Sequence, residues 1–191
     1  MSRAIGPFLN RSTRAVWLVT TGLLIAAVIL LLPAACGAQA QDWQTFKYPA
    51  DGFSAEFPSE PQQESKQIDA ASGTVELHSY LFDLDHVALY VGVCDYGSQA
   101  SGTDVDEMLE GAKNGALENS KAQLTRQAKI FLGSYHGVEF ESEGENTHYI
   151  ARIYIVGSKM YQTLVVYPSS TPYADAAHFL NSFQLLAHEK N

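Results

Sequence analysis

The feature that most constrains the fold of this chain is a series of short strand-like segments joined by tight turns. Apolar and polar residues alternate in 43–48 and again in 53–57, and the residues between these segments include the Pro and Gly typical of a turn. Gly157 and Ser158 separate two further segments and fit a two-residue type II′ hairpin. Strands joined by such short turns must run antiparallel. The expected strands are 43–48, 53–57, 64–70, 74–83, 86–96, 124–132, 137–143, 149–156, 159–167 and 183–187.

Two segments change from a period of two to the helical period of 3.6. Apolar residues recur at i, i+3, i+4, i+7 and i+11 from Val105 onward, which predicts an amphipathic helix with Thr103 as its N-cap. Thr171 and Pro172 begin a second helix that is expected to end near Ser182. Strands and helices in this order predict an α+β fold, in which two helices pack on a central antiparallel sheet. Because no repeat or low-complexity tract interrupts this order, a single domain is expected over residues 41–191.

Residues 1–40 differ in composition and are expected to form a targeting segment that precedes the domain. An uncharged apolar run of 18 residues, 15–32, follows three arginines, Arg3, Arg11 and Arg14. Such a run is long for a signal-peptide core and just long enough for a membrane-spanning helix. Pro33 breaks the helix, and Ala38 and Ala40 are the small residues that signal peptidase requires. A signal peptide cleaved after Ala40 and an uncleaved membrane anchor both stay open.

Lipoprotein processing is a third alternative for this segment. Residues 33–36 resemble a bacterial lipobox, in which Cys36 would be acylated and become the new N-terminus, although Pro33 stands where the usual Leu would be. In all three alternatives the arginines stay in the cytoplasm and residues 41–191 are exported. The expected location is therefore extracytoplasmic, in the periplasm or at the cell surface, with or without a membrane anchor.

The charge balance excludes several classes of partner. The chain has 12 basic and 21 acidic residues, a formal charge of −9; without the three N-terminal arginines the balance is nine against 21, or −12. A domain this acidic lacks the clustered cations that neutralise nucleic-acid phosphates, and anionic lipid surfaces repel it. Contact with a membrane is therefore expected only through the N-terminal segment or an acylated Cys36. Cys94 is the one cysteine after residue 40, so an internal disulfide would require Cys36.

The order of these elements and several short motifs resemble the Mog1/PsbP-like fold family, which includes bacterial DcrB-type lipoproteins. The motifs are Trp43-x-x-Phe46-x-x-Pro49-x-x-Gly52-Phe53-Ser54-x-x-Phe57-Pro58, the mid-chain helix, the hairpin from Arg152 to Leu164, and Phe179-Leu180-Asn181-Ser182-Phe183. The resemblance spans roughly residues 43–187. It implies a PsbP-like sandwich and a noncatalytic accessory or binding domain. Members of its plant photosystem branch assist metal retention, but no metal-binding motif of theirs is matched here.

The residues themselves supply one candidate metal site and no catalytic motif. Glu139, Glu141, Glu143 and Glu145 alternate with other residues, so in a strand their carboxylates would share one face and could hold Ca²⁺ or another hard divalent cation. The alternative is a solvated acidic strand face that prevents aggregation. The six histidines lack metalloenzyme spacing, and no Walker loop, dinucleotide motif or nucleophile elbow is present. No enzymatic activity is therefore expected, with an envelope hydrolase as the last alternative, and no cofactor is expected, with Ca²⁺ or another hard divalent cation as the alternative.

A second candidate site lies on the predicted hairpin around Gly157 and Ser158. A two-residue loop places Tyr154 opposite Tyr161 and Arg152 opposite Thr163 on one face, while Ile153 and its neighbours on the other face belong to the core. Tyr and Arg are enriched in binding hot spots. Arg152, Tyr154 and Tyr161 could therefore bind a partner, or the tyrosines could pack beneath another element.

These observations predict a noncatalytic, exported accessory or interaction module of the cell envelope, with an envelope protein as its partner. The alternative function is a metal- or small-ligand-binding extracytoplasmic domain. A cavity with convergent polar groups would favour a small ligand, whereas a flat, Tyr-rich sheet face would favour a protein partner.

Overall fold

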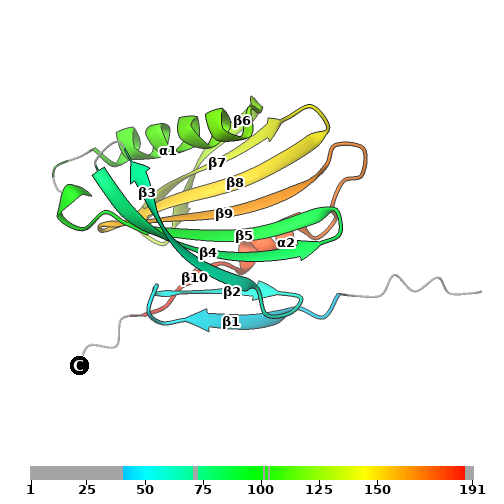
Figure 1. Cartoon of the computed structure of the whole chain (residues 1–191), viewed down its shortest axis with the longest axis horizontal. Helices are drawn as coiled ribbons and strands as arrows, with labels where there is room; N and C mark the ends of the chain where they lie inside the picture. Colours follow the sequence, from blue (N-terminus) through cyan, green and yellow to red (C-terminus); the bar gives the residue numbers. More distant parts are fainter. Residues whose placement is uncertain (1–40, 71–72, 101, 103, 188–191) are drawn as a thin grey trace, which may run out of the picture. The chain divides into compact units, whose positions relative to one another are not determined.

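Two antiparallel sheets form the framework of the domain (Figure 1). The computed structural model describes residues 41–70, 73–100, 102 and 104–187. The large sheet has seven strands in the order β3 (Gln62–Ala70), β4 (Gly73–Leu84), β5 (Val87–Asp95), β9 (Lys159–Pro168), β8 (Thr147–Val156), β7 (Tyr135–Glu143) and β6 (Gln123–Leu132). The small sheet has the order β1 (Gln44–Tyr48), β2 (Phe53–Phe57) and β10 (Gln184–Leu185).

A single crossover joins the two halves of the large sheet. The chain forms β3, β4 and β5 in succession, passes through a short 3₁₀ helix, η1 (Gly97–Ala100), and then forms α1 (Val105–Ser120). It resumes at the far edge with β6 and returns strand by strand, so that β9 pairs with β5 in the middle. Every pairing is antiparallel, and the predicted α+β architecture is confirmed.

The helix α1 covers one face of the large sheet, over β7 and β8. Its apolar stripe, which includes Leu109, packs against Phe140 and Ile153, both 1–2% exposed. The helix N-cap is Asp104, whose side chain accepts a hydrogen bond from the backbone N–H of Glu107 at 3.1 Å. The prediction of Thr103 as the N-cap is therefore wrong; Thr103 itself lies outside the described residues.

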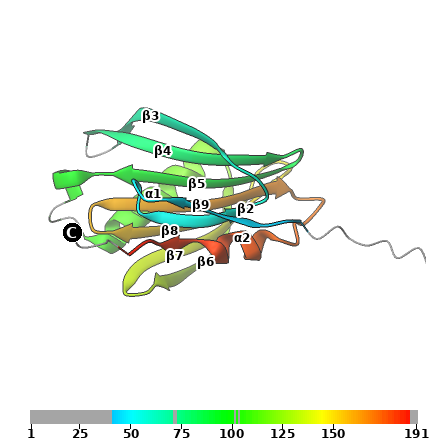
Figure 2. The ribbon, with the colours of Figure 1, turned by 90° about the horizontal axis from the view of Figure 1, so that it is seen from below.

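The small sheet and α2 (Ala176–Ser182) cover the opposite face of the large sheet, as Figure 2 shows. The core between these layers contains Phe53 and Phe57 of β2, Leu89 and Val165 of the large sheet, and Phe179 of α2, all at most 1% exposed. The second helix is shorter than predicted, because the backbone forms turns after Pro168 and Tyr173 before α2 begins at Ala176.

The β8–β9 hairpin has the register expected from the sequence. Gly157 adopts φ +61°, a positive value that glycine accepts without strain. Tyr154 pairs with Tyr161, and Arg152 pairs with Thr163. None of the helices among the described residues is both long and apolar enough to span a membrane, and the apolar run 15–32 lies outside those residues.

Candidate functional site

The predicted tyrosine pair lies in the core and not on an exposed surface. Tyr154 and Tyr161 are 5% and 3% exposed beneath the small sheet. The ring of Tyr154 stacks on Phe183 with centroids 6.0 Å apart, and the Tyr161 hydroxyl donates to the backbone oxygen of Asp51 at 2.7 Å. The prediction that Tyr154 and Tyr161 share one face is confirmed. The prediction that they form an exposed binding surface is wrong, and the alternative, that they pack beneath another element, is confirmed.

Arg152 lies on the same face and forms hydrogen bonds within the domain. Its Nε donates to Glu139 at 2.8 Å, and its Nη1 donates at 2.9 Å to the backbone oxygen of Leu180 and to Oδ1 of Asn181. The guanidinium therefore joins β7 and β8 to the last turn of α2. These three bonds hold the guanidinium against the domain, so the structure assigns Arg152 a role in holding α2.

The glutamate ladder forms an ion-pair network. Glu139 pairs with Arg152, and Glu141 accepts from Arg126 at 2.7 Å. Glu143 contacts Nδ1 of His148 at 2.5 Å and accepts from the Ser169 hydroxyl at 2.6 Å. These two neighbours, Ser169 first, lower the pKa of Glu143.

No group of three or more His, Cys, Asp or Glu side chains in the described part of the chain is placed to hold a metal ion. Calcium at the ladder stays a prediction that would require the three glutamates to leave these partners. Cys36 lies outside the described residues. Cys94 is buried, and burial raises the pKa of its thiol to about 11.

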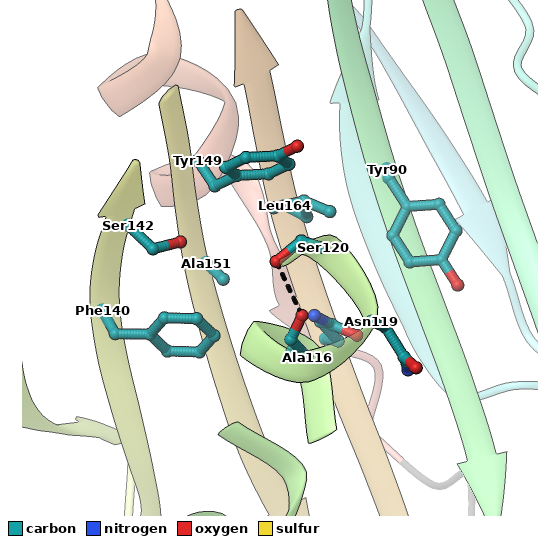
Figure 3. A pocket seen from close by; sticks show the side chains of 10 residues that line it. Tyr90, Ala116, Asn119, Ser120, Phe140, Ser142, Tyr149, Ala151 and Leu164 are labelled. Carbon is teal, nitrogen blue, oxygen red and sulfur yellow. Dashed lines mark hydrogen bonds between the residues drawn. The ribbon is translucent and has the colours of Figure 1, made fainter. Parts of the chain in front are cut away.

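A cleft on the other face of the large sheet brings together residues that the sequence did not single out (Figure 3). This α1 cleft has a volume of about 320 Å³, close to the lower end of the range found for small-molecule sites. It lies between the last turns of α1 and strands β5, β7, β8 and β9. The lining residues are Tyr90, Ala116, Asn119, Ser120, Phe140, Ser142, Tyr149, Ala151, Gln162 and Leu164.

The strand register creates the hollow. Phe140, Ala151, Leu164 and Tyr90 form one row of paired residues across β7, β8, β9 and β5. Large side chains stand at both ends of this row, and the methyl group of Ala151 leaves space between them. The ring of Tyr90 lies along its own strand over Gly92, where a Cβ would be only 2.6 Å from the tyrosine oxygen. Glycine at position 92 is therefore required for this placement of the ring.

Five of the six polar side chains that line the α1 cleft have no hydrogen-bond partner among the described residues. No hydrogen bond within the described residues involves the side chains of Tyr90, Asn119, Ser142, Tyr149 or Gln162. Ser142 is only 1% exposed. The fully buried side-chain oxygens without a partner in the described residues belong to Tyr48 and Thr163, so the Ser142 hydroxyl is open to the cleft, where a ligand or water can bind it.

The electrostatic character of the α1 cleft is neutral. Its ten lining residues include no Asp, Glu, Lys, Arg or His. Burial, with a smaller effect of Cys94, raises the pKa of Tyr90 to about 12, so its hydroxyl remains a hydrogen-bond donor at neutral pH. Ser120 donates to the backbone oxygen of Ala116 at 2.8 Å, and its own oxygen can still accept.

Comparison with solved structures identifies the fold. The solution structure of cyanobacterial PsbP (CyanoP) from Synechocystis matches 81% of this chain and 98% of its own length, with a TM-score of 0.52 and 14% identity. The chain has the PsbP-like fold. The resemblance predicted from the sequence is thereby confirmed for the fold.

Two further solved structures match the PsbP-like chain less well. A protein of unknown function from Pseudomonas aeruginosa is 10% identical over 73% of this chain and 89% of its own, and a protein from Bacteroides thetaiotaomicron is 16% identical over 79% and 51%. Their TM-scores are 0.36 and 0.39. No family model matches the sequence, and no curated protein matches it either.

The sequence of this PsbP-like domain carries a faint signal for the α1 cleft. Gln162 stands between Met160 and Leu164 on the face of β9 that packs toward α1, and Ser142 follows Phe140 on the same face of β7. A polar residue within an apolar face is the pattern that could have found them. The pairing of β9 with β5, which brings Gln162 and Tyr90 to the same cleft as Ser142, depends on the crossover through α1, and strand patterns do not show this crossover.

A second group of polar residues was also missed, because Asp51 was assigned only to a turn. Asp51 is 4% exposed; its Oδ1 contacts His78 Nδ1 at 2.7 Å, and its Oδ2 accepts a hydrogen bond from the Tyr80 hydroxyl. Burial, then the bond to Asp51, raises the pKa of Tyr80. This buried carboxylate connects the β1–β2 turn to β4 of the PsbP-like domain.

Proposed function

We propose that residues 41–191 form an exported, noncatalytic accessory domain that binds a small uncharged ligand in the α1 cleft. The observation that carries the proposal is the set of five polar side chains that line the cleft without a hydrogen-bond partner among the described residues, with Ser142 almost completely buried. The burial of Tyr154 and Tyr161 supports the same choice, because it removes the flat tyrosine face expected of a protein partner. The function therefore follows the second of the two alternatives left by the sequence.

A noncatalytic role is supported by the chemistry of the cleft. General acid–base catalysis uses a titratable group near neutrality, and nucleophilic catalysis pairs a nucleophile with a base. Ser142 and the two tyrosines have no such base beside them among the lining residues. The α1 cleft offers hydrogen bonds and apolar contact, which are the means of binding a molecule unchanged.

The experiment is a ligand-observed NMR screen of the full-length chain against uncharged ring compounds, namely sugars, phenols and lactams. Ala151→Leu and Ala116→Leu each fill the cleft from a different side, and both should abolish the signals of the compounds that bind. Ala177→Leu, on the exposed side of α2, is the matched control and should leave binding unchanged. Absence of binding to the wild type, or binding that survives both filling variants in folded protein, would refute the proposal.

A second candidate function, contact with an envelope protein, has one observation in its favour. The β6–β7 hairpin carries Phe131 and Tyr135, which are 65% and 40% exposed, the highest values among the aromatic side chains of the described residues. Exposed aromatic residues near one another occur at interaction sites. Affinity capture from envelope extract with wild type and Phe131→Ser tests it: loss of a captured protein in the variant is the expected result for a partner at this hairpin.

Export is supported by the arginines and the apolar run of residues 1–40. A phosphatase reporter that is active only after export, fused after residue 191, should be active; an inactive fusion protein in the cytosol would contradict export. Mass spectrometry of the N-terminus then distinguishes cleavage after Ala40, an acylated Cys36 and an intact anchor.

A further inference from the structure

We infer that the ligand of the α1 cleft is an uncharged sugar ring, an inference that rests on the function proposed above. Six of the ten lining residues carry a hydroxyl or a side-chain amide. Small-molecule sites are usually lined mainly by apolar side chains with few polar groups. The lining surface of the α1 cleft is likewise mostly apolar, and its six hydrogen-bonding groups could pair with a ligand that has polar groups on several sides.

The polar groups of the cleft lining can pair with ligand hydroxyls, because they both donate and accept hydrogen bonds. Each hydroxyl of Ser142, Tyr90 and Tyr149 can both donate and accept, and the amide of Gln162 presents one oxygen and one NH₂ group. A sugar hydroxyl can also donate and accept, so either partner of each protein–sugar hydrogen bond can be the donor. A planar phenol or quinone offers one or two such groups and would leave most of the cleft's polar side chains unpaired, at a cost in affinity.

Aromatic rings of the cleft could contact the C–H groups of a sugar ring. Figure 3 shows Phe140, Tyr149 and Tyr90 around the hollow, with the end of α1 carrying Ser120 and Asn119 beside them. The faces of aromatic rings carry partial negative charge and attract slightly positive hydrogens. The C–H groups of a pyranose form such a surface, whereas its hydroxyls point outward toward the polar lining.

Charge argues against ionic ligands. The lining residues include no charged side chain, and the cleft is at the C-terminal end of α1, where the helix dipole disfavours anions. The exported part of the chain also has a net charge of −12, from nine basic and 21 acidic residues. Phosphorylated and acidic sugars are therefore expected to bind less well than neutral ones.

The test is an NMR titration of the full-length chain with four probes: methyl β-glucopyranoside, N-acetylglucosamine, glucose 6-phosphate and 4-methylphenol. We expect at least one neutral sugar to bind and to shift resonances of cleft residues, with glucose 6-phosphate at least tenfold weaker. Gln162→Leu should weaken sugar binding about tenfold, the effect of one hydrogen bond of about 1.4 kcal/mol. Gln184→Leu, at an exposed position on β10, is the matched control and should bind as the wild type does.

Three results would overturn the inference. Binding of 4-methylphenol in the cleft without binding of either neutral sugar refutes the sugar and leaves the proposed small-ligand function standing. Sugar binding that neither Gln162→Leu nor Ala151→Leu reduces in folded protein places the sugar elsewhere. No binding of any of the four probes also refutes the sugar, and the broader screen with the filling variants then decides the proposed function independently.

Discussion

The hydroxyl of Tyr80 should contribute more to stability than the equally buried hydroxyl of Tyr161. Both rings lie in the same core, at 6% and 3% exposed. The Tyr80 hydroxyl donates to the carboxylate of Asp51, whereas that of Tyr161 donates to the neutral backbone oxygen of the same residue at 2.7 Å. Replacing each tyrosine by Phe removes one hydrogen bond and keeps the ring, so the comparison isolates the charge of the acceptor.

The magnitudes follow from the two acceptors. A hydrogen bond to a charged group contributes about 1.5–3 kcal/mol, and one between neutral groups about 0.5–1.5 kcal/mol. Asp51 is 4% exposed, so solvent screens the first bond little. Tyr80→Phe also leaves the carboxylate with His78 as its remaining side-chain hydrogen-bond partner among the described residues. We therefore expect Tyr80→Phe to lower the free energy of unfolding by about 1 kcal/mol more than Tyr161→Phe does.

Urea unfolding at pH 7, followed by circular dichroism, measures both variants against the wild type. With a slope of about 1–3 kcal/mol per molar urea, a loss of about 2 kcal/mol lowers the midpoint by roughly 1 M. The ring contacts of Tyr80 with Tyr48 and Phe53, at centroid distances of 4.1 and 5.0 Å, should persist in the variant. Equal losses, or a larger loss for Tyr161→Phe with unchanged slopes, would refute the assignment of a buried charged acceptor at Asp51.

Gly137→Ala should cost about 1–3 kcal/mol of unfolding free energy in the same assay, because the new Cβ would lie 2.5 Å from the ring of Tyr154 and 2.7 Å from a backbone oxygen; a neutral effect would contradict this packing. The hydrogen bond to Asp51 raises the pKa of His78, so its stabilisation is present below the unfolded pKa of about 6.5 and is lost as pH rises through the folded pKa. His78→Gln should therefore reduce the dependence of the urea midpoint on pH across that range. An unchanged pH dependence would mean that it arises from groups other than His78. Arg152→Met should cost about 1.5–3 kcal/mol and expose the end of α2 to faster amide exchange, whereas unchanged exchange would contradict its role there.

Local patterns were sufficient for most elements of the domain. The alternation in 53–57 predicted β2 with its observed ends, and the period from Val105 predicted the start of α1. Gly157 and Ser158 predicted the hairpin and its register, because a two-residue turn leaves one way to pair the flanking strands. The start of the second helix was predicted too early, because Pro172 is compatible with a turn as well as with a helix N-terminus.

The sites depended on contacts between distant segments, which single-strand patterns do not contain. The alternation correctly placed Tyr154 and Tyr161 on one face, but their cover comes from the small sheet and from Phe183. The same alternation placed the glutamates together without showing that Arg126 and Arg152 would pair with them. Burial of a strand face depends on what packs over it, so the sequence left both interpretations of each site open.

By itself the sequence determined the antiparallel strands and the two helices, because each depends on neighbours within a few positions, and its composition determined the acidic charge. A targeting role for residues 1–40 stays a prediction. Only the tertiary structure decided that β1, β2 and β10 form a separate sheet over the tyrosine face. It also decided that the crossover through α1 lines Phe140, Ala151, Leu164 and Tyr90 into the floor of a neutral cleft. The physical reason is that cavities and buried charges form where segments far apart in the chain pack together. The sequence of each segment is compatible with more than one packing partner, so it does not specify which segments meet.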